Sequence, residues 1–311
     1  MMRVAALIVL FGATLVAFAS PQVPFRGATE LVPIYATVTD NEGRLVPDLT
    51  KDDFEIRDDG TPQPIAVFSN EIQPITIIIM LDRSGSMMSH SDIVQHGAET
   101  LIGQLLPADR ARVGDFSQRI LIRPVNFISD RAELVNLLRT ALQRDANGPS
   151  PIWTAIGRTV AALNTESGRR VALVFTDGHD EPGPGQQRTD FGEVMRRALA
   201  DEVMVYSIGV PATMPRVYGY VNGRPIGSGT QSEPPDKHLK ELAEATGGGY
   251  LPFDWAQNLN ETFARVADEL HHQYVLGFKP QKLDGKTHAI DLRVTRKNLK
   301  VRARRSYIAS R

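Results

Sequence analysis

Three polar residues follow a long apolar run at intervals of two. Asp82, Ser84 and Ser86 come directly after the apolar stretch 75–81, and Gly85 between the two serines permits a tight turn. A loop of this kind can direct one carboxylate and two hydroxyls toward a single point. Because oxygen ligands suit a hard divalent cation, the loop is a candidate site for Mg²⁺, or for Mn²⁺ or Ca²⁺ in its place.

A second acidic position follows another apolar run. Asp177 lies in Thr176-Asp177-Gly178, directly after the stretch 171–175. Loops at the carboxyl ends of strands converge in an open α/β sheet, so Asp177 can face the same point as Asp82. Polar capping of two strand-to-helix turns is the plainer interpretation. A carboxylate and two hydroxyls in one loop exceed what a cap requires, which favours a metal site.

The composition narrows the chemistry further. The chain has 311 residues and no cysteine, which excludes disulfides, a thiol nucleophile, zinc–thiolate sites and iron–sulfur clusters. It has 35 Lys and Arg against 36 Asp and Glu, so the formal net charge is -1. A charge this close to zero gives no whole-chain attraction to nucleic acid, and we expect no nucleic-acid partner.

The first 19 residues are typical of an export signal. Arg3 is the only charged residue among them, the segment 4–19 is free of charge, and Ala17-Phe18-Ala19 is a cleavage motif. The pattern predicts a Sec-type signal peptide cleaved after Ala19 and a secreted or periplasmic protein. An uncleaved anchor is the alternative. The uncharged segment is shorter than the roughly 20 residues that a spanning helix needs, so no stable membrane span is expected after cleavage.

Strands and helices alternate through the middle of the chain. The runs 75–81 and 171–175 are typical of strands that are buried on both faces. Further strands are expected at 113–116, 120–125 and 203–208, and helices at 91–106, 130–144, 151–163, 191–200, 237–245 and 259–271. This order predicts an α/β fold with a doubly wound, mostly parallel sheet over residues 74–270. Residues 210–235, rich in Pro, Gly and Ser, are expected to form a surface loop.

Both ends of the chain have sequence patterns that are typical of β-strands. Strands are expected at 32–39 and 65–68 near one end, and at 275–279, 289–295 and 299–307 near the other, with a hairpin turn at 296–298. Residues 30–70 are too few to be stable as an isolated β unit. We therefore predict a small β-sandwich formed by 30–70 and 275–308, with the α/β domain inserted between them.

The acidic loops resemble a known metal site. Asp82-Arg83-Ser84-Gly85-Ser86 and Thr176-Asp177-Gly178 are similar to the D-x-S-x-S and T-D-G motifs of von Willebrand factor type A domains, and the similarity spans about residues 74–270. In that family, which has a Rossmann-like fold, these motifs and a threonine from another loop form a metal-ion-dependent adhesion site. Ser150 in Gly148-Pro149-Ser150-Pro151 stands where the threonine is expected and keeps its hydroxyl. The implied metal ligands are Asp82, Ser84, Ser86, Ser150 and Asp177.

The flanking segments carry a second resemblance. Asp53-Phe54-Glu55-Ile56 with Asp58-Asp59-Gly60, and later Tyr274-Val275-Leu276-Gly277-Phe278, resemble exported proteins with type A domains that are abundant in acidobacteria. That resemblance implies export and the two-part architecture more than a mechanism. A closing segment from Arg293 adds eight Lys or Arg and no acid. It is expected to be the solvated face of a hairpin, or alternatively a basic patch for an anionic polymer.

The resemblance implies a function in binding. The predicted role is an exported adhesion-type module whose bound cation engages a carboxylate on a partner protein, without enzymatic activity. A structural or assembly protein that binds its partner without metal is the alternative. A hydrolase that uses Ser84, His179 and Asp180 is disfavoured, because no Gly-x-Ser-x-Gly nucleophile elbow is present.

Overall fold

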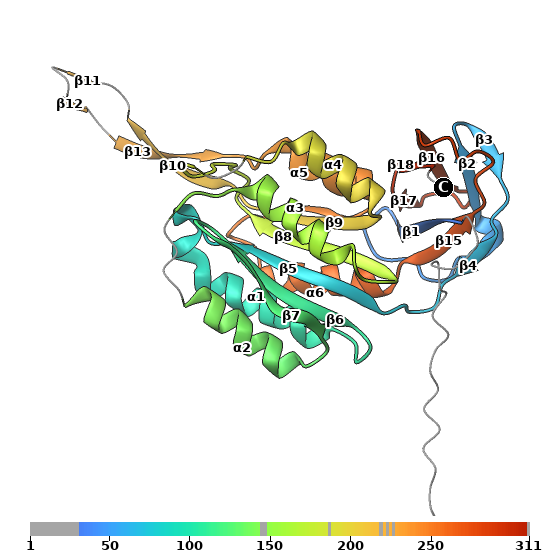
Figure 1. The fold of residues 1–311 in the computed structure, drawn as a ribbon, viewed down its shortest axis with the longest axis horizontal. Coiled ribbons are helices and arrows are strands. Elements are labelled where there is room, and N and C mark those ends of the chain that lie inside the picture. The colour runs from blue at the N-terminus through green and yellow to red at the C-terminus, as the bar shows by residue number, and fades with distance from the viewer. Residues whose placement is uncertain are drawn as a thin grey trace, which may run out of the picture.

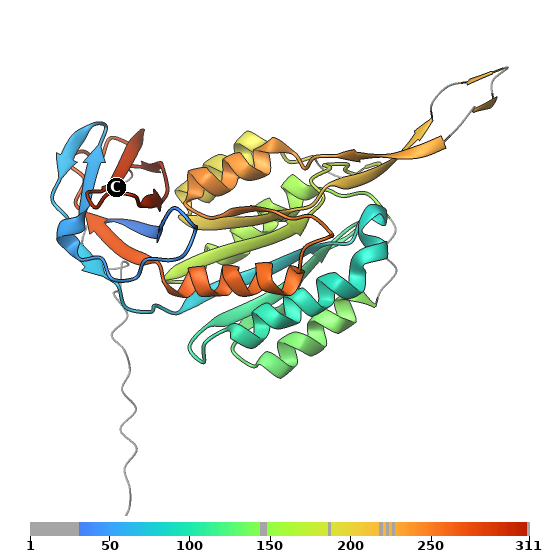
Figure 2. The same ribbon diagram turned by 180° about the vertical axis from the view of Figure 1, so that it is seen from behind.

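The computed structural model describes residues 31–143, 148–185, 188–217, 220–221, 224–225 and 228–309. A central α/β domain carries a small β unit at one end and a thin two-stranded ribbon at the opposite end (Figures 1 and 2). The predicted signal peptide, residues 1–19, lies outside the described residues. Among the residues described, no helix combines the length and apolar character needed to cross a membrane.

The central sheet is built on the two apolar runs. Its six strands lie in the order β14-β9-β8-β5-β6-β7, parallel throughout except where β7 pairs with β6. The strands are β5 (Ile75–Asp82), β6 (Arg110–Phe116), β7 (Ile120–Ile128), β8 (Arg169–Thr176), β9 (Val203–Gly209) and β14 (Tyr250–Pro252). Every residue of β5 and β8 is buried, as both faces of the sheet are covered. The predicted doubly wound, mostly parallel sheet is confirmed.

In the described residues, six helices cover the two faces of this sheet. One face packs on α1 (Ser91–Gln104), α2 (Arg131–Leu142) and α6 (Leu259–His271). The other packs on α3 (Ile152–Leu163), α4 (Phe191–Ala200) and α5 (Lys237–Thr246). Local chemistry sets the helix ends: Asp130 accepts a hydrogen bond from the Glu133 backbone N–H, and Gly247 ends α5 in the left-handed conformation.

The β unit takes strands from both ends of the chain. One sheet has the order β17-β1-β15-β4 and the other β18-β16-β2-β3. The strands are β1 (Val32–Thr39), β2 (Phe54–Asp58), β3 (Thr61–Gln63), β4 (Val67–Ser69), β15 (Tyr274–Phe278), β16 (Thr287–Val294), β17 (Lys300–Arg302) and β18 (Ser306–Ile308). Ile34, Phe54 and Leu276 belong to the apolar core of this unit. The predicted β-sandwich of amino- and carboxyl-terminal strands is confirmed.

Two expectations from the sequence were wrong. The segment 299–307 is not one strand of a hairpin with β16: β17 pairs with β1 in one sheet, while β18 pairs with β16 in the other. The chain changes sheets between them, so each strand fills a free edge. The expected loop 210–235 is an antiparallel ribbon of β10 (Ala212–Val217) and β13 (Ser228–Glu233), extended by β11 (Tyr220–Val221) and β12 (Arg224–Pro225). A two-stranded ribbon has only edge strands, which tolerate proline and glycine.

Buried polar side chains join the β unit to the α/β domain. Glu269 of α6 accepts hydrogen bonds from Tyr206 of β9 and Thr37 of β1, and pairs with Arg302 of β17. Gln273 donates to the Thr37 hydroxyl at 2.8 Å and to the Tyr206 hydroxyl at 3.0 Å. A single carboxylate therefore links residues more than 200 positions apart in the chain.

The basic closing segment is largely neutralised. Five of its arginines form ion pairs with acids: Arg293 with Asp291, Arg296 with Asp48 and Asp53, Arg302 with Glu269, Arg304 with Glu202 and Arg305 with Glu244. Three of these acids, at positions 202, 244 and 269, belong to the α/β domain. The segment thus helps to dock the β unit, which argues against a free basic patch.

Candidate functional site

The five predicted ligands lie at the carboxyl ends of adjacent parallel strands. Asp82 is the last residue of β5, and Asp177 follows β8 directly. Ser84 directly precedes the short 3-10 segment Gly85–His90, Ser86 lies at its start, and Ser150 precedes α3. The edge is the one from which the ribbon projects, opposite the β unit (Figure 1).

The carboxylate of Asp82 is at the centre of the contacts. Its Oδ1 accepts the Ser84 backbone N–H at 2.8 Å, which tightens the loop. Its Oδ2 accepts the Ser150 hydroxyl at 3.0 Å and the Thr176 hydroxyl at 2.6 Å. Residue types and spacing in the sequence did not identify Thr176 as a site residue. The signal available in the sequence was its position directly before Asp177.

The serines of the first loop connect to the second acid. The hydroxyls of Ser84 and Ser86 are 3.1 Å apart, and Ser86 donates a hydrogen bond to Asp177 Oδ2. All five predicted residues are therefore brought together. Four of them, Asp82, Ser84, Ser150 and Asp177, are at most 5% exposed, whereas Ser86 lies on the open side.

The backbone around the site holds these side chains in place. Ser150 and Glu181 exchange two backbone hydrogen bonds of 2.9 Å, which tie the loop before α3 to the loop after β8. Gly178 has a φ of +83°, and a Cβ there would lie 2.6 Å from the Asp236 backbone nitrogen. Only glycine fits at position 178, because any side chain there would collide with the backbone at Asp236.

Two buried carboxylates give the site its electrostatic character. Asp82 and Asp177 are each 2% exposed. Burial raises the pKa of Asp82 to about 6, and the neighbouring charge of Asp177 adds to the rise. Within the described part of the chain, neither acid forms an ion pair with Lys, Arg or His. Two acids without a cationic partner, surrounded by hydroxyl oxygens, fit a hard divalent cation.

A pocket of about 490 Å³ borders the site. Gly178, His179 and Asp180 of the loop after β8 form one wall, and Trp153 and Phe191 form an aromatic wall. Burial raises the pKa of Asp180. The pocket offers both apolar and charged surface beside the acidic centre.

The contact that a serine hydrolase needs is not formed. His179 Nε2 lies 3.9 Å from Glu233 Oε2, and among the described residues no histidine bonds to the hydroxyl of Ser84 or Ser86. A nucleophilic serine requires a base within hydrogen-bond reach. The geometry therefore gives the hydrolase alternative no support.

Comparison with models of known protein families identifies the type of domain in the middle of the chain. Residues 77–179, which include both acidic loops, match the model of the von Willebrand factor type A domain. The protein contains a von Willebrand factor type A domain. A solved von Willebrand factor type A structure from Catenulispora acidiphila aligns over 92% of this chain and 76% of its own, with 12% identity and a TM-score of 0.51. At this identity the likeness concerns the fold alone.

Other solved structures align over less of the chain. An aerotolerance-related membrane protein from Bacteroides fragilis aligns over 63% of this chain and 98% of its own, with 17% identity and a TM-score of 0.48. Proximal thread matrix protein 1 from the mussel byssus, solved with a zinc-occupied MIDAS motif, aligns over 65% and 49%, with 15% identity and a TM-score of 0.46. No curated protein matches the sequence. The resemblance to exported acidobacterial proteins stays a prediction.

Proposed function

We propose that the protein is an exported binding module whose type A domain holds Mg²⁺ and uses it to engage a carboxylate of a partner protein. The convergence of Asp82, Ser84, Ser86, Ser150 and Asp177 carries this proposal. Two buried acids that have no cationic partner among the described residues support a divalent cation at that point. The motif at residues 1–19 supports export.

The residues of the site have distinct roles in this proposal. Asp82 and Asp177 supply the negative charge, and the hydroxyls of Ser84, Ser86 and Ser150 supply neutral oxygen ligands. The bound cation would contribute electrostatic attraction for an anionic oxygen of the partner. Thr176 orients Asp82 through its hydrogen bond, and the exposed side at Ser86 leaves room for that oxygen.

The surroundings of the site suit a protein ligand. The pocket beside Gly178 can receive a side chain next to the partner's acid. The β10–β13 ribbon projects from the same edge of the sheet and extends the surface that a partner can touch (Figure 2). A partner would thus contact the metal, the pocket and the ribbon together.

A peptide library tests the proposal directly. Peptides are selected on the immobilised protein in Mg²⁺ and eluted with EDTA. We expect the enriched peptides to share an Asp or Glu, and replacing it by the matching amide should weaken binding at least about 10-fold, because a carboxylate–cation contact is lost. Enriched peptides that stay bound in EDTA, or that bind equally without their acid, contradict the proposal and favour the metal-free assembly role.

Ser150 provides a milder test of the ligand set. Ser150→Ala removes one hydroxyl oxygen from the site and is expected to lower Mg²⁺ affinity by about 10-fold, measured by isothermal titration calorimetry. Ser207→Ala is the matched control, since Ser207 is a buried serine of β9 whose hydroxyl has no hydrogen-bond partner in the described part of the chain. Equal Mg²⁺ affinity in the two variants would remove Ser150 from the ligand set.

A further inference from the structure

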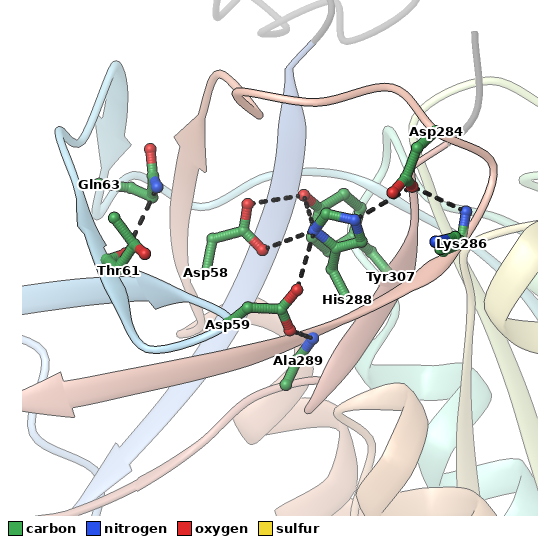
Figure 3. Close-up of polar contacts among 9 residues, drawn as sticks. All are labelled: Asp58, Asp59, Thr61, Gln63, Asp284, Lys286, His288, Ala289 and Tyr307. Carbon is green, nitrogen blue, oxygen red and sulfur yellow. Dashed lines mark hydrogen bonds and ion pairs between the residues drawn. The ribbon is translucent and has the colours of Figure 1, made fainter.

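A second cluster of possible ligands lies in the β unit. Asp58 ends β2, Asp59 follows it in the β2–β3 turn, and His288 lies on β16 (Figure 3). His288 Nδ1 is 3.1 Å from Asp58 Oδ1 and 3.3 Å from Asp59 Oδ2. The three ligand atoms all lie within 4.8 Å of one another. The cluster is separate from the type A site, which lies at the opposite end of the central sheet (Figure 1).

The other polar atoms of the three side chains have partners outside the triangle. Asp58 Oδ2 accepts the Tyr307 hydroxyl at 3.0 Å, and Asp59 Oδ1 accepts the Ala289 backbone N–H at 2.8 Å. His288 Nε2 lies 3.2 Å from Asp284 Oδ1. A carboxylate on one ring nitrogen orients a metal-binding histidine and leaves its other nitrogen for the metal. The outer contacts thus aim Asp58 Oδ1, Asp59 Oδ2 and His288 Nδ1 at one another.

The distances in the triangle match a tetrahedral metal centre. Zinc binds nitrogen and carboxylate oxygen at about 2.0–2.2 Å, which places neighbouring ligand atoms of a tetrahedron about 3.3 Å apart. The two distances from Nδ1 have this length. Closing the third edge needs only a movement of Asp59, whose side chain is 57% exposed. The same exposure leaves the fourth position open to water.

Charge gives a further reason for a cation. Three carboxylates surround one imidazole, and in the described residues neither Lys nor Arg forms an ion pair with Asp58, Asp59 or Asp284. Asp58 and His288 are each 6% exposed, so water screens this charge poorly. One nitrogen and two oxygen ligands suit zinc better than Mg²⁺ or Ca²⁺, which prefer six or more oxygens.

We propose that Asp58, Asp59 and His288 form a zinc site that fastens the β2–β3 turn to β16. Asp284 and Tyr307 position the ligands without contacting the metal. The site joins strands that are 230 residues apart in the chain, so an occupied site stabilises the β unit against separation of the two chain ends. The proposal is independent of the function of the type A site.

Zinc titration in an Asp82→Asn background tests the site without interference from the first one. Calorimetry with zinc chloride should give one equivalent of bound zinc and an upward shift of the melting temperature. Asp59→Asn should weaken zinc binding at least about 10-fold, because asparagine keeps the turn and the Ala289 contact but loses the anionic ligand. Asp291→Asn, an equal change of charge at an ion-paired residue on β16, should leave zinc affinity unchanged.

A second measurement keeps the proposal testable if the Asp59→Asn variant fails to fold. Crystals of the zinc-soaked Asp82→Asn protein should give an anomalous peak at the zinc edge between the three ligand atoms, and His288→Gln should remove it. No zinc binding in the Asp82→Asn background overturns the proposal. Affinities that Asp59→Asn does not change also overturn it, and leave His288 as an imidazolium held by three carboxylates.

Discussion

Asp82→Asn is expected to abolish Mg²⁺ binding and, at the same time, to stabilise the metal-free protein. The variant keeps the shape of the side chain and an oxygen for the Ser84 backbone N–H, but removes the central anionic ligand. Loss of one of two charged ligands should lower Mg²⁺ affinity by at least about 100-fold. The gain in stability arises because burial of the Asp82 carboxylate, together with the neighbouring charge of Asp177, destabilises its charged form when no cation is present.

The stability change has a defined pH dependence. The pKa of Asp82 is raised to about 6 in the folded protein, so between about pH 4 and pH 6 the folded state binds more protons than the unfolded chain. The free energy of unfolding of the metal-free protein therefore decreases as pH rises through this window. A rise of about two pKa units corresponds to a stability difference on the order of 3 kcal/mol at pH 7, which Asp82→Asn should recover.

Urea denaturation at pH 4.5 and pH 7, with and without Mg²⁺, checks this prediction. In EDTA at pH 7 the variant should be more stable than wild type, and in saturating Mg²⁺ the order should reverse, because only wild type gains from binding. Asp130→Asn is the control, since asparagine caps α2 as well as aspartate does and the charge change is the same. If Mg²⁺ stabilises wild type and Asp82→Asn equally, Asp82 is not a ligand.

The convergence of side chains at the first cluster could be predicted because its signals are local in sequence. Asp82, Ser84 and Ser86 occupy one turn, and Asp177 follows a second apolar run, so strand order alone brings them together. Thr176 was missed because its role depends on the direction of its side chain at the end of β8, where it meets Asp82. Alternation of residues along one strand does not specify such a contact.

The second cluster could not be predicted in the same way. In the sequence, Asp58 and Asp59 form an ordinary turn motif with Gly60. His288, 230 residues after Asp58, lies close to a predicted strand that carries no motif of its own. Their meeting depends on the register of β2 against β16, in which Asp58 is opposite Ile290. Sandwich registers between distant chain ends are set by packing, which leaves no local pattern.

The lack of a local side-chain pattern also explains the wrong prediction of a loop for residues 210–235. The strands 32–39, 75–81 and 171–175 were found because burial of both faces or of one face leaves a clear apolar pattern. The segment 210–235 is rich in Pro, Gly and Ser, so its composition resembles a loop although the backbones of β10 and β13 are paired. The existence of the ribbon follows from backbone hydrogen bonds, which no side-chain pattern encodes.

Glu269→Ala is expected to be the most damaging change at the junction of the two parts. The carboxylate accepts from Tyr206 and Thr37 and pairs with Arg302, so alanine leaves a guanidinium and two hydroxyls without their acceptor. Removing one partner from a buried charged network costs about 3 kcal/mol or more. Glu269→Gln keeps an acceptor of similar shape and should cost roughly half as much.

Chemical denaturation followed by two probes distinguishes a junction from an ordinary buried contact. Both tryptophans, Trp153 and Trp255, lie in the α/β domain, whereas far-UV circular dichroism reports on the whole chain. In Glu269→Ala the dichroism transition should begin at lower urea than the tryptophan transition, because the β unit loses its attachment first. Glu241→Ala, the same change at an exposed position on α5, should leave the two transitions coincident. A loss of stability in Glu269→Ala with coincident probes would mean that the network stabilises the molecule as one cooperative unit rather than fastening two parts.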